Sequence, residues 1–207
     1  MLTLYDHPVS SNALKVRFLL AELGLEYERR EVPMAQPRPQ WYLDVNPVGG
    51  IPTLADGPIT LAESHAILRY LADRQGAAAL YPVGYAERSR VEQFLDRYAT
   101  KFRSAFFAVE ALALGYTPQV GFGGAQPDPE AARAKEAEIA PLIRTFDSLI
   151  SSSGYALGRF TIADCAVAPV LFRTTKTDMD LSPYPNLLRM RDTVLARPAF
   201  DAAGPVQ

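Results

Sequence analysis

The sequence has little of what disulfide-bonded, metal-binding and membrane proteins need. Cys165 is the one cysteine in 207 residues, so no internal disulfide can form and no cysteine-rich metal site is possible. The two histidines, His7 and His65, are too few and too far apart in sequence for a metal cluster, so we expect no metal. No apolar run approaches the ~20 residues of a membrane span, and no signal peptide is visible. These absences predict a soluble, cytoplasmic protein.

The chain also lacks an excess of basic residues. Its formal net charge is -2, which argues against nucleic acid as the main partner. Hydrophobic residues make up 48% of the chain, enough for a packed core, so disorder is not expected. The length suits one large domain or two small ones.

The first 77 residues alternate between strand and helix patterns. Short alternating or apolar runs at residues 2–5, 27–32, 51–55 and 59–61 predict strands, and helical spacing predicts helices at 13–23, 41–43 and 63–74. The helix between the first two strands implies a parallel pair, and the turn at residues 56–58 implies an antiparallel hairpin. We therefore expect an α/β domain over residues 1–77, with βαβαββα order and a mixed four-stranded sheet.

Beyond residue 77 the sequence predicts only helices and loops. Residues 78–85 are typical of a linker, and amphipathic helices are expected at 86–114, 130–150, 161–174 and 185–197. Residues 115–129 are rich in glycine and proline and are expected to form a loop. The second domain is therefore expected to be all-α and to span residues 86–207.

Two motifs in the first domain indicate a binding site for a peptide-like anion. Residues 46–54 place an Ile51-Pro52 bond directly before an apolar strand, and Glu63 and Ser64 stand where a helix is expected to begin. Backbone groups beside a proline and the free N–H groups of a helix start are suited to bind such an anion. The sequence therefore predicts one site that uses both segments.

A third motif lies in the second domain. Thr161 and Asp164 have the spacing of a capping box. The three motifs and the order of the domains resemble the cytosolic glutathione S-transferase family, and more closely its bacterial, serine-type members with a theta- or zeta-like first domain. The resemblance covers the whole chain. It implies a thioredoxin-like glutathione-binding domain followed by a helical domain.

The resemblance implies that Ser10 is the catalytic residue. Family members place a Ser, Cys or Tyr after the first strand, where it donates a hydrogen bond to the glutathione sulfur. A free thiol has a pKa of about 8.5, so a nearby hydroxyl and a helix N-terminus favour the reactive thiolate. Ser11 is the alternative, and Ser10, Ser11 or Asn12 is also expected to cap the helix. Tyr5 lies inside the first expected strand, where a core position is favoured.

No cysteine stands in the first domain, so the mixed-disulfide chemistry of the Cys-type members is not expected. Cys165 falls in an expected core helix and is interpreted as a buried, inert thiol.

The resemblance also assigns residues to glutathione binding. Ile51, before a cis-Pro52, would pair its backbone with the cysteinyl part of glutathione. Ser64 would bind the γ-glutamyl carboxylate, and Glu63 would help to orient the site. The alternative for Glu63 and Ser64 is ordinary helix capping and dipole compensation.

Two positions depart from the family pattern. Many relatives carry Lys where this chain has Gly50, and some carry His or Gln where it has Pro37; both residues bind the glycyl carboxylate. Arg38 or Gln40 would have to substitute, so weak glutathione binding is an open alternative.

Asp96 matches a family residue that reaches the glutathione of the partner subunit in a homodimer. Its alternative is a solvated helix charge.

The second substrate is expected between the domains. Tyr98, Phe102, Phe106 and Tyr116 are candidates for an apolar wall, although aromatic residues at helical spacing are also typical of a core. The nearby cations Lys101 and Arg103 would favour an anionic or polar co-substrate. The glycine-rich loop after residue 116 would act as a lid.

The sequence thus predicts a homodimeric glutathione transferase that conjugates glutathione to small hydrophobic electrophiles, with no metal. Three alternatives remain open. They are a non-catalytic ligand-binding or regulatory member, a glutathione-dependent isomerase or dehalogenase, and an interaction protein of the stringent-starvation type.

Overall fold

Four short strands form the sheet of the first domain. In the computed structural model, which describes residues 1–205, they are β1 (Leu2–Asp6), β2 (Tyr27–Glu31), β3 (Thr53–Asp56) and β4 (Ile59–Ala62). Their order is β2-β1-β3-β4, with β1 parallel to β2 and antiparallel to β3, and β3 antiparallel to β4. The predicted parallel crossover and antiparallel hairpin are therefore confirmed.

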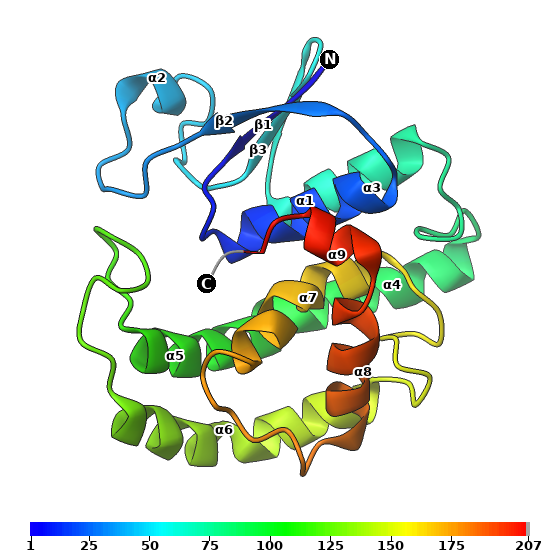
Figure 1. The fold of residues 1–207 in the computed structure, drawn as a ribbon. Helices are drawn as coiled ribbons and strands as arrows, with labels where there is room; N and C mark the ends of the chain where they lie inside the picture. Colours follow the sequence, from blue (N-terminus) through cyan, green and yellow to red (C-terminus); the bar gives the residue numbers. More distant parts are fainter. Residues whose placement is uncertain (206–207) are drawn as a thin grey trace.

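Three helices complete this domain: α1 (Ser11–Glu22), α2 (Gln40–Leu43) and α3 (Ser64–Arg74). Figure 1 shows α1 and α3 between the sheet and the helical domain, while α2 lies away from that interface. Because α1 is covered on both sides, eight consecutive residues, 13–20, are buried. Two of them, Lys15 and Arg17, carry charge into the interior.

The second domain consists of helices, as predicted. They are α4 (Tyr85–Arg97), η1 (Tyr98–Phe102), α5 (Arg103–Leu114), α6 (Pro129–Leu149), α7 (Ile162–Thr174), α8 (Pro185–Leu195) and α9 (Pro198–Ala202). The single helix expected at 86–114 contains a π-helical turn, η1, between α4 and α5. A π turn holds an extra residue, so the residues that follow it are rotated about the helix axis.

Helix α7 runs through the middle of the molecule, against α1 and α8 (Figure 1). The predicted capping box at its start is confirmed: the Asp164 carboxylate accepts hydrogen bonds from the backbone N–H groups of Thr161 and Ala156, each at 2.7 Å. Burial raises the pKa of Asp164 to about 6. The next residue, Cys165, is fully buried, and burial raises the pKa of its thiol well above the usual value, as expected of an inert thiol.

Three of the four aromatic residues predicted to line a substrate pocket belong to the core instead. Tyr98, Phe102 and Phe106 are buried and pack around Phe146 of α6, with ring centroids 4.6–6.0 Å apart. They recur every four residues and so form one stripe, which faces α6. That prediction was wrong for these three residues.

The predicted loop after α5 is folded back on itself. Gly115 ends α5 with φ +63°, and a Cβ there would lie 2.1 Å from the carbonyl oxygen of Ala125. An isolated β-bridge joins Thr117 and Gly121. None of the helices among residues 1–205 is long and apolar enough to cross a membrane.

Candidate functional site

The loop between β1 and α1 holds Ser10 at the start of a helix. Ser10 has extended backbone angles, and its Oγ accepts a hydrogen bond from the N–H of Ala13 at 3.3 Å, so it is the N-cap of α1. Its own N–H donates to the carbonyl oxygen of His7 at 2.9 Å. The expected capping role of this serine cluster therefore falls to Ser10.

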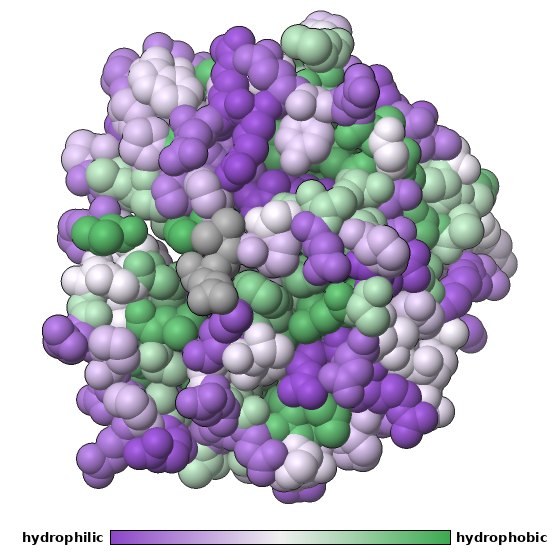
Figure 2. Space-filling model, in the orientation of Figure 1, coloured by the Kyte–Doolittle hydropathy of each residue, from purple (hydrophilic) through white to green (hydrophobic). Residues whose placement is uncertain are grey.

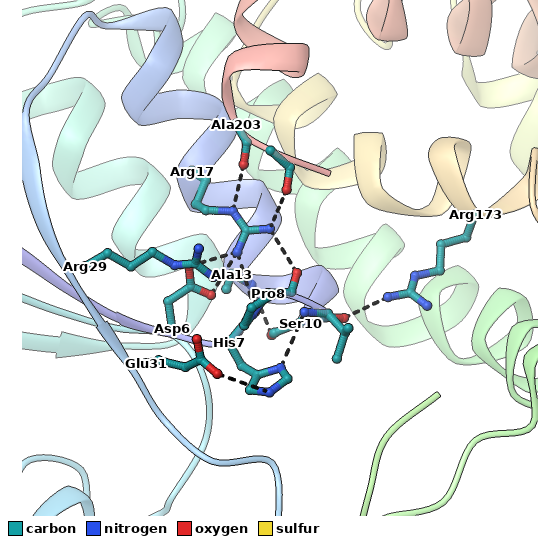
Figure 3. Close-up of polar contacts among 12 residues, drawn as sticks. Asp6, His7, Pro8, Ser10, Ala13, Arg17, Arg29, Glu31, Arg173 and Ala203 are labelled. Carbon is teal, nitrogen blue, oxygen red and sulfur yellow. Dashed lines mark hydrogen bonds and ion pairs between the residues drawn. The ribbon is translucent and has the colours of Figure 1, made fainter. Parts of the chain in front are cut away.

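A buried arginine, Arg17, holds this loop from within the first domain (Figure 3). The guanidinium of Arg17 pairs with the carboxylate of Asp6 at 2.8 and 2.9 Å and donates to the carbonyl of Pro8 at 3.1 Å. It also donates to the carbonyl of Ala203, near the end of the described chain, at 2.9 Å. Arg29 makes a second ion pair with Asp6 at 2.8 Å. The buried carboxylate is thus satisfied by two cations.

A second arginine holds the loop from the helical domain. Arg173 of α7 donates to the carbonyl of Val9 at 2.7 Å. Figure 3 shows Arg17 and Arg173 approaching the loop from opposite sides. The residue before Ser10 is therefore anchored to the second domain, and the position of Ser10 is set by both halves of the chain.

Ser10 lines a cavity of about 390 Å³ between the two domains. This volume lies within the range of small-molecule sites, roughly 300–1,000 Å³. The first domain contributes residues 9–12, Met34, Arg38 and Ile51; the second contributes residues of η1, α5 and the loop that follows α5. Within residues 1–205, no three His, Cys, Asp or Glu side chains are grouped to hold a metal ion.

Five of the predicted site residues come together in this cavity: Ser10, Ser11, Arg38, Ile51 and Tyr116. They come from four separate segments of the chain. Arg38 is held by backbone carbonyls, donating to Gly49 at 3.1 Å and to Pro33 at 2.6 Å.

The Ile51-Pro52 peptide bond is cis, as predicted. Pro52 is buried, and Ile51 precedes β3, whose pairing with β4 starts at Thr53. The carbonyl of Gly50 accepts hydrogen bonds from the Asn46 amide at 2.9 Å and from the Tyr42 hydroxyl. These bonds hold the loop so that the backbone of Ile51 lies at the cavity.

Glu63 and Ser64 begin α3 but do not line the cavity. Glu63 is exposed with φ +66°, a conformation that non-glycine residues rarely adopt. Ser64 is largely buried as the first residue of the helix, whose initial N–H groups have no partner within the helix.

Gln40 and Asp96 also lie outside the cavity. The amide of Gln40, the first residue of α2, donates to the carboxylate of Asp44 at its C-cap at 2.8 Å. Asp96 is exposed on α4, 3.7 Å from Arg69.

Two of the aromatic residues of the cavity were not predicted from the sequence. Phe107 and Phe122 pack with Tyr116, with ring centroids 5.0–6.1 Å apart, and all three line the cavity. Phe107 belongs to a stripe with Ala99 and Arg103, one residue along from the core stripe. The four-residue spacing of this stripe was visible in the sequence, but nothing there showed which of the two stripes faces the cavity.

Charged side chains lie at the cavity wall formed by the helical domain and in the interior next to it. Arg103 donates to Ser11 Oγ at 3.0 Å and lies 3.4 Å from the carboxylate of Glu110. Burial raises the pKa of Glu110, while the positive charges of Arg103 and Arg173 oppose this rise. Burial, with the charge of Arg103, lowers the pKa of Lys15 to about 7, and burial lowers that of Arg173 to about 10.

The two domains match two known family models. Residues 1–73 match the model described as Glutathione S-transferase, N-terminal domain, and residues 129–189 match the one described as Glutathione S-transferase, C-terminal domain.

Individual relatives are similar over nearly the whole chain. Glutathione S-transferase GstB of Escherichia coli (strain K12) is 30% identical over 206 residues, which cover 96% of this chain and 95% of that protein. The probable maleylacetoacetate isomerase of Caenorhabditis elegans is 30% identical over 206 residues, 98% of this chain and 92% of that protein. The crystal structure of a theta class glutathione S-transferase from Xanthomonas axonopodis pv. citri with glutathione bound has a TM-score of 0.83 at 26% identity, covering 100% of this chain and 98% of that one.

Proposed function

Because the chain belongs to the glutathione S-transferase family, we propose that it binds glutathione between its domains and transfers it to a small electrophile. One observation carries the proposal. The same cavity contains two serine hydroxyls at the start of α1, the backbone of Ile51 beside a cis-proline, and an aromatic wall from the helical domain. A thiol bound at the serines would thus lie beside the site for an apolar second substrate.

The first domain offers contacts along the length of a tripeptide. The backbone of Ile51 just before β3, outside the pairing that starts at Thr53, would bind the cysteinyl unit as an added strand does. Ser64 and the N-terminus of α3 suit the γ-glutamyl carboxylate. The positive φ of Glu63 supports a functional role at that end, since such strain, roughly 1–3 kcal/mol, clusters at ligand sites. At the other end, Arg38 offers a guanidinium for the glycyl carboxylate.

Ser10 is proposed as the thiolate donor. A serine hydroxyl has one O–H donor and two acceptor lone pairs. Capping Ala13 uses a lone pair, so the O–H of Ser10 stays available to the glutathione sulfur. The thiolate then attacks an electrophilic carbon; with an aryl halide the new C–S bond replaces the C–halogen bond, and halide leaves with the bonding electrons.

Ser11 remains the alternative donor. Its Oγ accepts a hydrogen bond from Arg103, which also leaves an O–H free. Substitutions at the two positions therefore separate the two roles.

Homodimerisation is part of the proposal. Asp96 is exposed on α4, which supports its proposed contact with the glutathione of a partner subunit. Gln40 is the weaker of the proposed glycyl-carboxylate ligands, because its amide is already bonded to Asp44.

The test combines calorimetric titration of glutathione with conjugation of chlorodinitrobenzene, on wild type, Ser10→Ala and Ser11→Ala. We expect all three proteins to bind glutathione. We expect Ser10→Ala to lower kcat/KM about 10- to 100-fold, as for loss of a hydrogen bond to a charged group worth ~1.5–3 kcal/mol. A large loss in Ser11→Ala alone would move the role to Ser11. No binding at millimolar glutathione would overturn the proposal and favour a non-catalytic member with Gly50 and Pro37 in place of the usual ligands.

Glutathione-dependent isomerisation is the second candidate, favoured by the similarity to the C. elegans isomerase. Turnover of maleylacetoacetate that requires glutathione, without conjugation of chlorodinitrobenzene, would select it.

A further inference from the structure

The charged residues that line the cavity are all cationic. Among the described residues they are Arg38 and Arg103, and no Asp or Glu lines the cavity. Arg38 lies on the side of the first domain, where the proposed function assigns it to glutathione. Arg103 comes from α5, on the side of the second substrate, and has no role in that scheme.

Arg103 is held rigidly at the edge of the cavity. Its side chain is 16% exposed. It donates to Ser11 Oγ at 3.0 Å and lies over the ring of Phe107, 5.1 Å from the centroid. Its two hydrogen bonds to Glu110 are 3.4 and 3.5 Å long, whereas charged N–H···O bonds are typically about 2.7–2.9 Å. Glu110 therefore does not satisfy the guanidinium fully.

Positive charges also outnumber negative charges in the interior next to the part of the cavity that Arg103 lines. The charge of the same Glu110 also acts on Arg173, whose guanidinium donates to Val9 and lies 3.8 Å from the ring centroid of Phe122. Lys15 is buried nearby and pairs with neutral His65 at 3.3 Å rather than with an acid. The one buried carboxylate of Glu110 thus faces two arginines, Arg103 and Arg173, with Lys15 partly protonated at neutral pH, and the cavity wall keeps a positive potential.

The rest of this side of the cavity is mainly aromatic. Phe107, Tyr116 and Phe122 pack edge-to-face there. Figure 2 shows hydrophobic residues gathered at the left, over α5 and the loop that follows it, where the two domains meet.

We infer that the second substrate is a carboxylate-bearing electrophile with a planar unsaturated body, bound with its carboxylate on Arg103 and its plane against Phe107, Tyr116 and Phe122. The inference rests on the proposed function for its chemistry but on the cavity alone for its binding. A guanidinium suits a carboxylate because its parallel N–H groups match the two oxygens. The aromatic rings suit a planar body.

The test uses a matched pair of aryl halides: a chlorodinitrobenzoate with its carboxylate para to the chlorine, and its methyl ester. In both, the thiolate displaces chloride from the ring carbon, so they differ only at the carboxyl group. Each kcat/KM is divided by the uncatalysed rate constant with glutathione. We expect wild type to favour the acid, and Arg103→Gln to lower the acid-to-ester ratio about tenfold, near 1.4 kcal/mol.

Lys101→Gln is the matched control, because Lys101 is an exposed cation two residues away that does not line the cavity. It removes the same charge and should leave the ratio unchanged. Arg103→Gln leaves the carboxylate of Glu110 buried without this cationic partner. If that makes the variant unstable, the double variant Arg103→Gln, Glu110→Gln is measured in its place.

A binding measurement without glutathione tests this inference independently of the proposed function. Dinitrobenzoate, which has no leaving group, is titrated calorimetrically into the same proteins without glutathione. Binding to wild type that weakens about tenfold in Arg103→Gln supports the inference even if no conjugation is found. A wild-type preference for the ester, or equal ratios and affinities in Arg103→Gln and Lys101→Gln, overturns it while leaving glutathione transfer intact.

Discussion

At the scale of single residues, Ser10 combines a structural and a chemical role in one hydroxyl. As the N-cap of α1 it accepts from Ala13, so Ser10→Ala should lower the free energy of unfolding by about 1 kcal/mol. Ser10→Asp keeps an acceptor for the cap but has no O–H donor at neutral pH. We therefore expect this variant to keep its stability in urea and to lose conjugation.

Ser10→Thr is the control, since it keeps both the acceptor and the donor. A Ser10→Asp variant that conjugates like wild type would contradict the role of the hydroxyl as donor.

Gly50 is a position where a side chain can be added. An ideal Cβ would have Asn46 as its neighbour at 3.9 Å, an ordinary contact, and its φ is not positive. Gly50→Lys would place an ammonium beside the cis-proline loop, where many family members carry lysine. We expect tighter glutathione binding by about three- to tenfold in calorimetry, the range of one net hydrogen bond of ~0.5–1.5 kcal/mol.

Gly50→Met is the control for length without charge. If Gly50→Lys and Gly50→Met gain the same affinity for glutathione, or if neither gains any, the absence of a lysine at position 50 does not weaken binding of the glycyl carboxylate.

Part of the candidate site and of the core could be predicted from the sequence, because the motifs concerned are local. The Ile51-Pro52 bond and the Thr161–Asp164 capping box each need only a few neighbouring residues, and both were predicted. The roles of Arg17 and Arg173 were not, because their partners lie in distant segments: Ala203 in one case and Val9 in the other.

At the scale of elements, the continuous helical segment α4–η1–α5 shows that hydrophobic periodicity alone does not predict which face of a helix lines a cavity. The sequence predicted one helix over residues 86–114, and the structure has a π turn at Tyr98–Phe102 within it. Two adjacent stripes then run along the helix, one into the core through Phe106 and one into the cavity through Phe107. The core stripe holds three aromatic residues and the cavity stripe only Phe107, so a search for an aromatic pocket wall favoured the stripe that is in the core.

Helix α1 carries a buried lysine that should make stability depend on pH. Lys15 lies against His65 of α3 and above the ring of Tyr98, with Arg103, Glu110 and Glu63 also acting on it. Its pKa falls from 10.5 to about 7, mainly because of burial. Between these values the unfolded chain keeps a proton that the folded protein has lost. The free energy of unfolding should therefore rise with pH between about 7 and 8.5, by on the order of 2 kcal/mol at ~1.4 kcal/mol per pH unit. Above that range the thiol of Cys165, whose pKa burial raises, opposes the rise.

Lys15→Met should flatten this rise in urea unfolding and stabilise the protein at neutral pH. Asp164, with a pKa raised to about 6, acts below this window and does not interfere. Lys101→Met, at an exposed site, should leave the slope unchanged. A slope that persists in Lys15→Met would show that another group titrates here.

At the scale of the whole molecule, the two domains share one interior. Helix α1 packs against α7 and α9 as well as α3. Phe18 of α1 meets Phe160 and Phe200 of the helical domain edge-on, at 5.7 and 5.3 Å between ring centroids. The order of the two domains and their secondary structure were predictable from the pattern. Their shared interior was not, because it is built from contacts between residues more than a hundred positions apart.

This shared interior predicts that the domains unfold together. Trp41 is the sole tryptophan and lies in the first domain, so its fluorescence follows that domain, while far-ultraviolet circular dichroism follows mainly the helices of the second. The two signals should give coincident urea transitions.

Arg17→Met should shift both equally, since Arg17 joins Asp6 and Pro8 to Ala203. We expect a loss of about 3 kcal/mol, the lower part of the range for breaking a buried pair, because Arg29 still compensates Asp6. The exposed Arg30→Met should cost little, since its pair with Glu28 is solvated. Separate transitions in wild type, or a shift of one signal only in Arg17→Met, would mean that each domain is stable without the other.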